Sequence, residues 1–193
     1  MNKVKDASVA YKTRPKVYTY EDLLKTPEDG KRYEIIQGEL VMSAAPFLIH
    51  QAIIGNLYEV LRKHAKENDL GRVYFSPVDV VLSEINVLEP DLLFVSHENS
   101  KIITEKNIQG APDLVIEVLS PSTAYYDLIG KKEIYEHYGV LEYWIVDPKR
   151  QTLELFASKD GKFELAQKLE QNGSAKSGIL PNLRLAWGEI FAD

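Results

Sequence analysis

The sequence predicts an α/β protein whose sheet has antiparallel strands at its edges. Residues 113–147 read as strand, helix and strand, which is typical of a right-handed crossover joining two parallel strands. Residues 32–42 and 152–169 each read as two strand-like runs around a turn, which is typical of an antiparallel hairpin. We expect one domain over 17–193 and a loose tail over 1–16, because 193 residues suit one core and the composition shows no break.

The N-terminal part of the domain is predicted to begin with a short helix over 20–25. Thr19 and Asp22 approximate the capping box that opens such a helix. The hairpin over 32–42 follows and turns at Gln37-Gly38, where glycine permits a tight turn.

The longest predicted helix covers 47–68. Its apolar residues recur at helical spacing, charged residues occupy the other face, and Gly71 ends it. These apolar residues are Ile53, Ile54, Leu57, Tyr58 and Leu61. Strands are then predicted over 72–82, where Pro77 bends or breaks the run, and over 91–96.

The most apolar strand is predicted over 113–119, and its continuous apolar run indicates a central strand covered on both faces. A helix over 123–138 follows and ends at Gly139. The remaining strands are predicted over 142–147, 152–158, 162–169 and 183–191, the last ending in a short turn.

Charge and composition narrow the functional classes. The net charge of −6 argues against indiscriminate binding to nucleic acid, although an enzyme with a local basic groove remains open. The absence of cysteine excludes disulfides, thiolate zinc sites and cysteine nucleophiles. No apolar run approaches the roughly 20 residues that span a bilayer. We therefore expect a cytoplasmic protein without a membrane segment.

Three carboxylates are the first candidate site residues. Asp91 and Asp113 each follow a proline at the start of an apolar run, and Glu117 lies inside the second run. A buried carboxylate is costly unless a metal or a cation offsets its charge. If the two strands are neighbours, Asp91 and Glu117 can converge on one divalent cation. The alternative for either aspartate is that Pro-Asp only starts a strand or turn.

The helix after Glu117 offers a cation. Asp127, Lys131 and Tyr135 are four residues apart, so they share one side of the helix. The ring of Tyr135 indicates that this side faces the sheet, where a lysine could stabilise charge on a phosphate. An exposed Asp127–Lys131 pair is the alternative, and Lys132 competes with Lys131 for the role.

Five segments together resemble the bacterial restriction endonuclease-like family of the PD-(D/E)XK nuclease superfamily, from about Tyr18 to the C-terminus. They read YEIIQGELVM, SAAPFLIHQAIIGNL, EPDLLFV, APDLVIEVLSPST and DLIGKKEIYEHYGVLEYWIVDP. The resemblance implies a restriction-endonuclease-like mixed β-sheet flanked by helices, with an N-terminal β-hairpin and antiparallel C-terminal strands. It also implies metal-dependent hydrolysis of phosphodiester bonds.

The resemblance assigns roles to the candidate residues. Asp91 and Glu117 match the two acidic positions, and these would hold Mg²⁺, with Mn²⁺ as the alternative ion. Leu119 stands where the superfamily's lysine is expected, two residues after Glu117. The resemblance implies that the lysine is relocated to the helix, where Lys131 matches the family's D-x-x-x-K motif.

Two further residues are secondary candidates. His50 stands near the start of the long helix, where this family tends to carry histidine, and it could orient a phosphate or a metal-bound water. A satisfied structural histidine is the alternative that we favour. Glu34 fits the family's Tyr-Glu pair but has no evident chemical partner in the sequence, so we expect a structural role.

The resulting hypothesis is a Mg²⁺-dependent endonuclease that cleaves DNA. A homodimer is expected because cutting both strands usually needs two sites, and Trp187 and Phe191 are candidate contacts unless they pack in the core. The alternatives are an inactive nuclease-fold binding or interaction module and a hydrolase of small phosphorylated molecules. The sequence does not indicate whether a methyltransferase partner exists.

Overall fold

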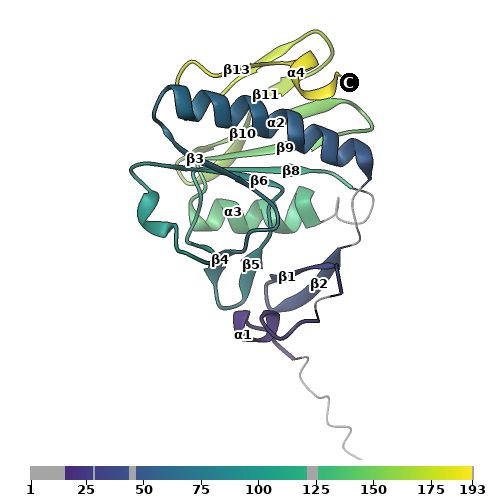
Figure 1. Cartoon of the computed structure of the whole chain (residues 1–193), viewed down its shortest axis with the longest axis vertical. Coiled ribbons are helices and arrows are strands. Elements are labelled where there is room, and N and C mark those ends of the chain that lie inside the picture. The colour runs from purple at the N-terminus through teal and green to yellow at the C-terminus, as the bar shows by residue number, and fades with distance from the viewer. Residues whose placement is uncertain (1–15, 28, 44–46, 121–125, 193) are drawn as a thin grey trace, which may run out of the picture.

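The computed structural model describes residues 16–27, 29–43, 47–120 and 126–192, with side chains in the last range from residue 128 (Figure 1). Apart from Lys16, the expected tail over 1–16 lies outside the described residues. No helix in these ranges is long and apolar enough to cross a membrane.

The larger of the two main sheets has six strands in the order β11-β10-β9-β8-β6-β3. Their bounds are Gly71–Phe75 (β3), Leu92–Ser96 (β6), Leu114–Val118 (β8), Glu142–Asp147 (β9), Thr152–Lys159 (β10) and Lys162–Leu169 (β11). Strands β8 and β9 are parallel, and all other neighbours in this sheet are antiparallel. This confirms the predicted crossover, the C-terminal hairpin and the α/β class with antiparallel edges.

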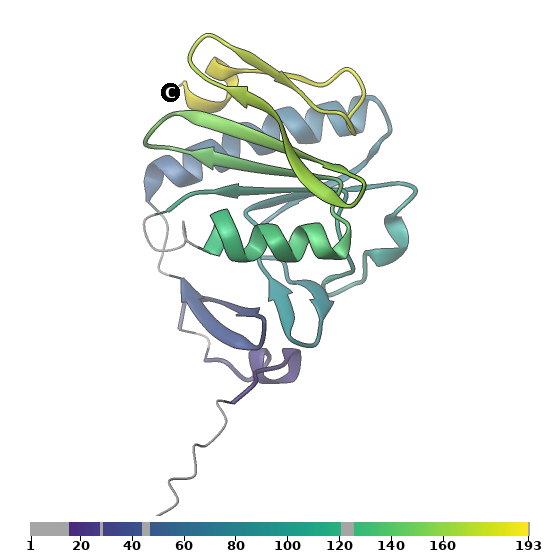
Figure 2. The same cartoon turned by 180° about the vertical axis from the view of Figure 1, so that it is seen from behind.

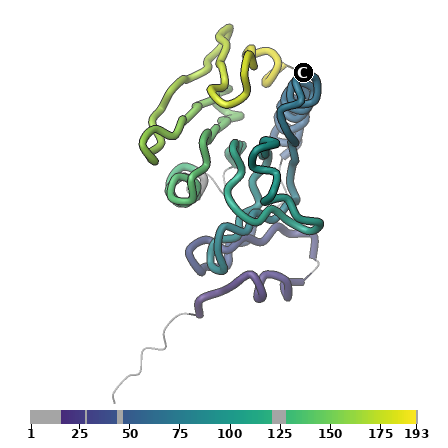
Figure 3. Tube along the Cα trace, turned by 90° about the vertical axis from the view of Figure 1, so that its left-hand side faces the viewer, coloured from purple at the N-terminus to yellow at the C-terminus, as the bar shows by residue number. Residues whose placement is uncertain are grey.

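Helices cover both faces of this sheet. Helix α2 (Leu48–Glu67) crosses one face, and α3 (Lys132–Tyr138) lies on the other, as the two opposite views and the edge-on view show (Figures 1, 2 and 3). A π-helical segment, Tyr126–Lys131, leads into α3, and the predicted start of this helix at 123 lies outside the described residues. Gly139 ends α3 in the left-handed conformation, as predicted.

Strand β8 is central, and all five of its residues are buried. Ile116 packs with the apolar residues of α2, whereas Val115 packs with those of α3. Side chains alternate along a strand, so Glu117 belongs to the α3 side with Val115. The predicted alternation thus places a carboxylate under α3.

A second sheet, which the sequence did not predict as a separate unit, lies below the first (Figure 1). Its strand order is β2-β1-β5-β4-β7, with bounds Arg32–Ile36 (β1), Glu39–Ser43 (β2), Val80–Ser83 (β4), Asn86–Leu88 (β5) and Ile108–Gln109 (β7). The short helix α1 (Tyr20–Leu23) packs beside it. The run over 72–82 is broken near Pro77, and its halves enter different sheets as β3 and β4.

The predicted N-terminal hairpin is present. Gln37 and Gly38 have φ values of 51° and 81°, the backbone signs that two-residue hairpin turns require. Three boundaries differ from the prediction. Helix α1 ends at Leu23 instead of residue 25, and α2 ends at Glu67, so that Gly71 is the first residue of β3. The strand predicted over 183–191 covers only Arg184–Ala186, and Trp187–Phe191 is helical.

The C-terminal segment closes the α2 face of the large sheet. Strands β12 (Ser174–Lys176) and β13 (Arg184–Ala186) form a two-stranded sheet that leads into α4 (Trp187–Phe191). Phe191 is buried in the apolar cluster that includes α2, and Trp187 packs against that cluster. Both aromatic residues therefore pack in the core, which was the alternative to a role as dimer contacts.

Candidate active site

The candidate residues meet where the two sheets adjoin, between β1 of the smaller sheet and β8 of the larger one. The contributing segments are β1, the connection from β5 to β6, β8, the first turn of α2, and the π-helical segment with α3. We call the following side chains the charged cluster: Arg32, Glu34, His50, Glu89, Asp91, Glu117, Lys131 and Tyr135.

Lys131 lies between two buried carboxylates. Its Nζ is 2.9 Å from Oε1 of Glu34 and 3.2 Å from Oε1 of Glu117. The Tyr135 hydroxyl donates a hydrogen bond of 3.1 Å to the same oxygen of Glu117. Lys131, Glu34 and Glu117 are each at most 4% exposed, so water screens these interactions little.

Asp91 is held from three sides. Its Oδ1 accepts a hydrogen bond of 3.1 Å from Nη1 of Arg32, and its Oδ2 lies 3.2 Å from Nε2 of His50. The backbone N–H of Val118 donates to Oδ2 at 2.9 Å. These contacts orient the carboxylate beside the strand that carries Glu117.

The pairing of β6 with β8 explains why Asp91 and Glu117 are neighbours. Leu92 is opposite Ile116 in this antiparallel pair. One step further along the register, Asp91 is opposite Glu117. The strands that follow Asp91 and contain Glu117 are therefore neighbours, which the sequence analysis required for a shared site.

Arg32 and Glu89 connect the two halves of the cluster. Besides Asp91, Arg32 donates to Oε2 of Glu89 at 3.1 Å and to the backbone carbonyl of Glu89 at 2.7 Å. The backbone N–H of Glu89 in turn donates to Oε1 of Glu34 at 2.8 Å. The network is therefore continuous from Asp91 through Arg32, Glu89, Glu34 and Lys131 to Glu117.

Burial and charge shift the pKa values in this network. Burial alone would raise the pKa of Asp91, but the contacts with His50, Arg32 and the Val118 amide together lower it. For Glu89, burial outweighs the neighbouring Arg32 and raises the pKa of the carboxyl. Burial and the charge of Glu117 raise the pKa of Tyr135 well above its ordinary value, so its hydroxyl stays protonated as a donor.

The charged cluster has an excess of negative charge. Four carboxylates face two cations, so its formal charge is −2 when His50 is neutral. The carboxylates belong to Glu34, Glu89, Asp91 and Glu117, and the cations to Arg32 and Lys131. An excess of carboxylates over cations among these side chains favours binding of a cation at this place. Among the described residues, however, no three His, Asp or Glu side chains form a ready-made metal cage.

Of the other predicted residues, Asp113 and Lys132 lie outside this cluster. Oδ2 of Asp113 accepts a hydrogen bond of 2.7 Å from the backbone N–H of Ser96, so it holds the end of β6. Nζ of Lys132 lies 3.7 Å from the centre of the Phe156 ring on β10. The side chain of Asp127 lies outside the described residues.

Sequence reasoning understated Glu34 and missed Arg32 and Glu89. Glu34 has the chemical partners that the sequence did not reveal, namely Lys131 and the Glu89 amide. Arg32 and Glu34 are two residues apart on β1 and therefore share a face with the buried Ile36. Two charged residues on the same face as a core isoleucine are the signal that could have identified them.

Comparison with known proteins agrees with this architecture. A family model named Uma2 and described as "Putative restriction endonuclease" matches residues 19–188. The chain belongs to the Uma2 family. The resemblance seen in the sequence is thereby confirmed. No curated protein matches the chain.

A solved structure shares the Uma2-like fold of this chain. It is the crystal structure of a putative nuclease belonging to DUF820 from Anabaena variabilis, which matches with a TM-score of 0.75 and 20% sequence identity. The match covers 90% of this chain and 97% of that one. At this identity the likeness establishes the mixed α/β fold, and residue roles depend on the geometry of the charged cluster itself.

Proposed function

We propose that this Uma2-family chain is a Mg²⁺-dependent endonuclease that hydrolyses phosphodiester bonds of DNA, with Mn²⁺ as an alternative ion. The observation that carries the proposal is the buried charged cluster, in which Asp91 is hydrogen-bonded to the strand that carries Glu117 and carboxylates outnumber cations. Family membership supports the reaction class.

The donor set fits a hard divalent cation. Mg²⁺ commonly binds one or two carboxylates and completes its octahedron with water and substrate phosphate, so Asp91 and Glu117 suffice without a third acidic ligand. The formal charge of −2 is the charge that such an ion neutralises. When bound, the ion would lower the pKa of a water molecule that it holds and would polarise the scissile phosphate.

We assign to Lys131 the role of the lysine that is missing after Glu117. Glu34 and Glu117 hold its ammonium group in place and favour its charged form, since both carboxylates lie within 3.2 Å. A fixed, desolvated ammonium group stabilises negative charge that develops on a non-bridging phosphate oxygen. Lys131 thus acts on the phosphate, and Glu34 is a positioning residue.

The remaining side chains of the cluster orient the carboxylates. Tyr135 donates to Glu117 and fixes its rotamer. His50 and Arg32 fix Asp91 in the same way, from α2 and from β1. Groups held by several elements keep catalytic geometry within a narrow range. A homodimer would then place two such sites on the two strands of a duplex.

The test is cleavage of supercoiled plasmid in Mg²⁺, in Mn²⁺ and in EDTA. Asp91→Asn, Glu117→Gln and Lys131→Ala should each lower the rate by about 10²-fold or more. Lys132→Ala, the neighbouring lysine that contacts Phe156 instead, should retain activity and serves as the control. Folding of each variant is checked by circular dichroism. Cleavage that survives all three substitutions would exclude this site.

One observation favours the alternative of a nuclease-fold module that binds without cutting. Arg32 already forms an ion pair with Asp91, which partly compensates the charge that a metal would neutralise. If the chain is such a module, the native chain would not bind Mg²⁺, whereas Arg32→Ala would bind it because the compensating cation is removed. Binding of DNA without cleavage by the native chain in either metal would support this second function.

A further inference from the structure

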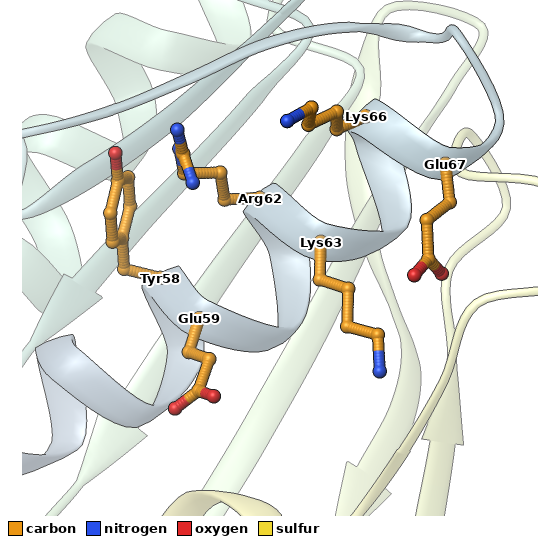
Figure 4. Close-up of a pocket in the computed structure, with 6 residues that line it drawn as sticks. All are labelled: Tyr58, Glu59, Arg62, Lys63, Lys66 and Glu67. Atoms are coloured by element: carbon orange, nitrogen blue, oxygen red, sulfur yellow. The ribbon is translucent and has the colours of Figure 1, made fainter.

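Three side chains on the exposed side of α2 take no part in the charged cluster. Tyr58, Arg62 and Lys66 are four residues apart, and Figure 4 shows them extending from the same side of the helix. We call them the basic stripe. Together with Glu59, Lys63 and Glu67, they line a surface hollow of about 570 Å³.

The two cations of the basic stripe lack an ion-pair partner among the described residues. Arg62 and Lys66 are exposed, and neither forms an ion pair of 4 Å or less with any residue that the structure describes. Figure 4 shows Glu59, Lys63 and Glu67 on the other side of the helix, where opposite charges alternate. Like charges at a spacing of four repel each other, so an anion bound between Arg62 and Lys66 would relieve that repulsion.

An aromatic pair adjoins the stripe. The rings of Tyr58 and Phe75 meet edge to face with centroids 4.7 Å apart, and Phe75, on β3, is 50% exposed. Exposed aromatic rings beside cationic side chains are typical of surfaces that follow a nucleic-acid backbone. A small anion would need the cations but not the aromatic platform.

The basic stripe and the charged cluster both include residues of α2. His50 in the first turn of α2 contacts Asp91, and Lys66 lies in the last turn of the same helix. At 1.5 Å per residue, these positions are about 24 Å apart along the helix axis. One turn of duplex DNA is roughly 34 Å long, so this axial separation is shorter than one turn of a duplex.

We propose that the basic stripe binds the phosphate backbone of duplex DNA at a place separate from the cleavage site. The choice of polymer rests on the proposed endonuclease function, whereas the claim about the stripe concerns binding alone. Arg62 and Lys66 contact consecutive phosphates, and Tyr58 with Phe75 contacts the adjoining sugar. The α2 helix thereby joins the phosphate-binding surface to the residue that orients Asp91.

The test measures binding to a labelled 20-base-pair duplex by fluorescence anisotropy as a function of salt, with Mg²⁺ present. All proteins carry Glu117→Gln, so that cleavage does not interfere. The stripe variant is Arg62→Ala with Lys66→Ala. The control is Lys25→Ala with Lys176→Ala, which removes the same charge from exposed lysines of other segments without ion pairs to described residues.

We expect the stripe variant to lower the slope of log affinity against log salt by about 2, since each phosphate contact contributes roughly 0.9. The control should keep the native slope. An unchanged slope in the stripe variant, or equal losses in both variants, would overturn the proposal. A stripe-dependent slope with duplex RNA but not with duplex DNA would overturn the choice of polymer.

These outcomes are separable from those of the cleavage assay. A native chain that cuts plasmid while the stripe variant keeps its salt slope would refute the stripe and leave the endonuclease proposal standing. A native chain that binds through the stripe and cuts nothing would support the stripe and refute the endonuclease proposal. The thermal midpoint of the stripe variant should not fall, because the substitutions remove a repulsion and no described contact.

Discussion

At the scale of single residues, the position of Lys131 is the most informative feature of the charged cluster. Spacing along the helix favoured Lys131 over Lys132, and the structure places Lys131 against Glu117 while Lys132 contacts an aromatic ring. Spacing could not show that Glu34, nearly a hundred positions earlier, supplies a second carboxylate to Lys131. That contact depends on how the two sheets adjoin, which no local pattern encodes.

This arrangement makes a stability prediction. Lys131→Met should destabilise the fold by about 3–5 kcal/mol, because it leaves the Glu34 and Glu117 carboxylates buried without their cation. Lys132→Met loses a cation–π contact and should change the free energy of unfolding by about 1 kcal/mol or less. Urea unfolding in EDTA measures both. Equal effects of the two substitutions would contradict the described network.

At the scale of secondary-structure elements, hydrophobic periodicity predicted the helices and strands that are long enough to show a pattern. The run LVIEVL is apolar at every position but Glu117, and this reports burial on both faces of β8. The long helix and both hairpins follow equally local rules. Strands β5 and β7 were not predicted, because two or three residues are too few to show an alternating pattern.

The turn between β1 and β2 gives a prediction at this scale. Gly38 has a φ of +81°, and an added Cβ would lie 2.7 Å from Cγ1 of Val17. Gly38→Ala should therefore destabilise the protein by about 1–2 kcal/mol. Gly55→Ala, in the middle of α2 with no atom within 4 Å of its new Cβ, should stabilise it by about 0.5–1 kcal/mol. Thermal unfolding tests the contrast, and the same sign for both variants would contradict it.

At the scale of the whole molecule, the site exists because two sheets adjoin. The sequence predicted the α/β class and, through its resemblance to the family, the nuclease-like arrangement that the comparisons support. It treated the strands as one sheet, so Arg32 and Glu34 could not be brought to Asp91 and Glu117. Register within a sheet follows from alternation, but the docking of one sheet against another depends on tertiary packing.

The central claim is that the buried charged cluster is a divalent metal centre. Calorimetric titration of the metal-free chain with Mn²⁺ tests it most directly, with Glu117→Gln as the matched variant that removes one negative charge and keeps the shape of the side chain. We expect one ion to bind per native chain and Glu117→Gln to lose that binding. Absence of binding at millimolar Mn²⁺, or equal binding by both proteins, would contradict it.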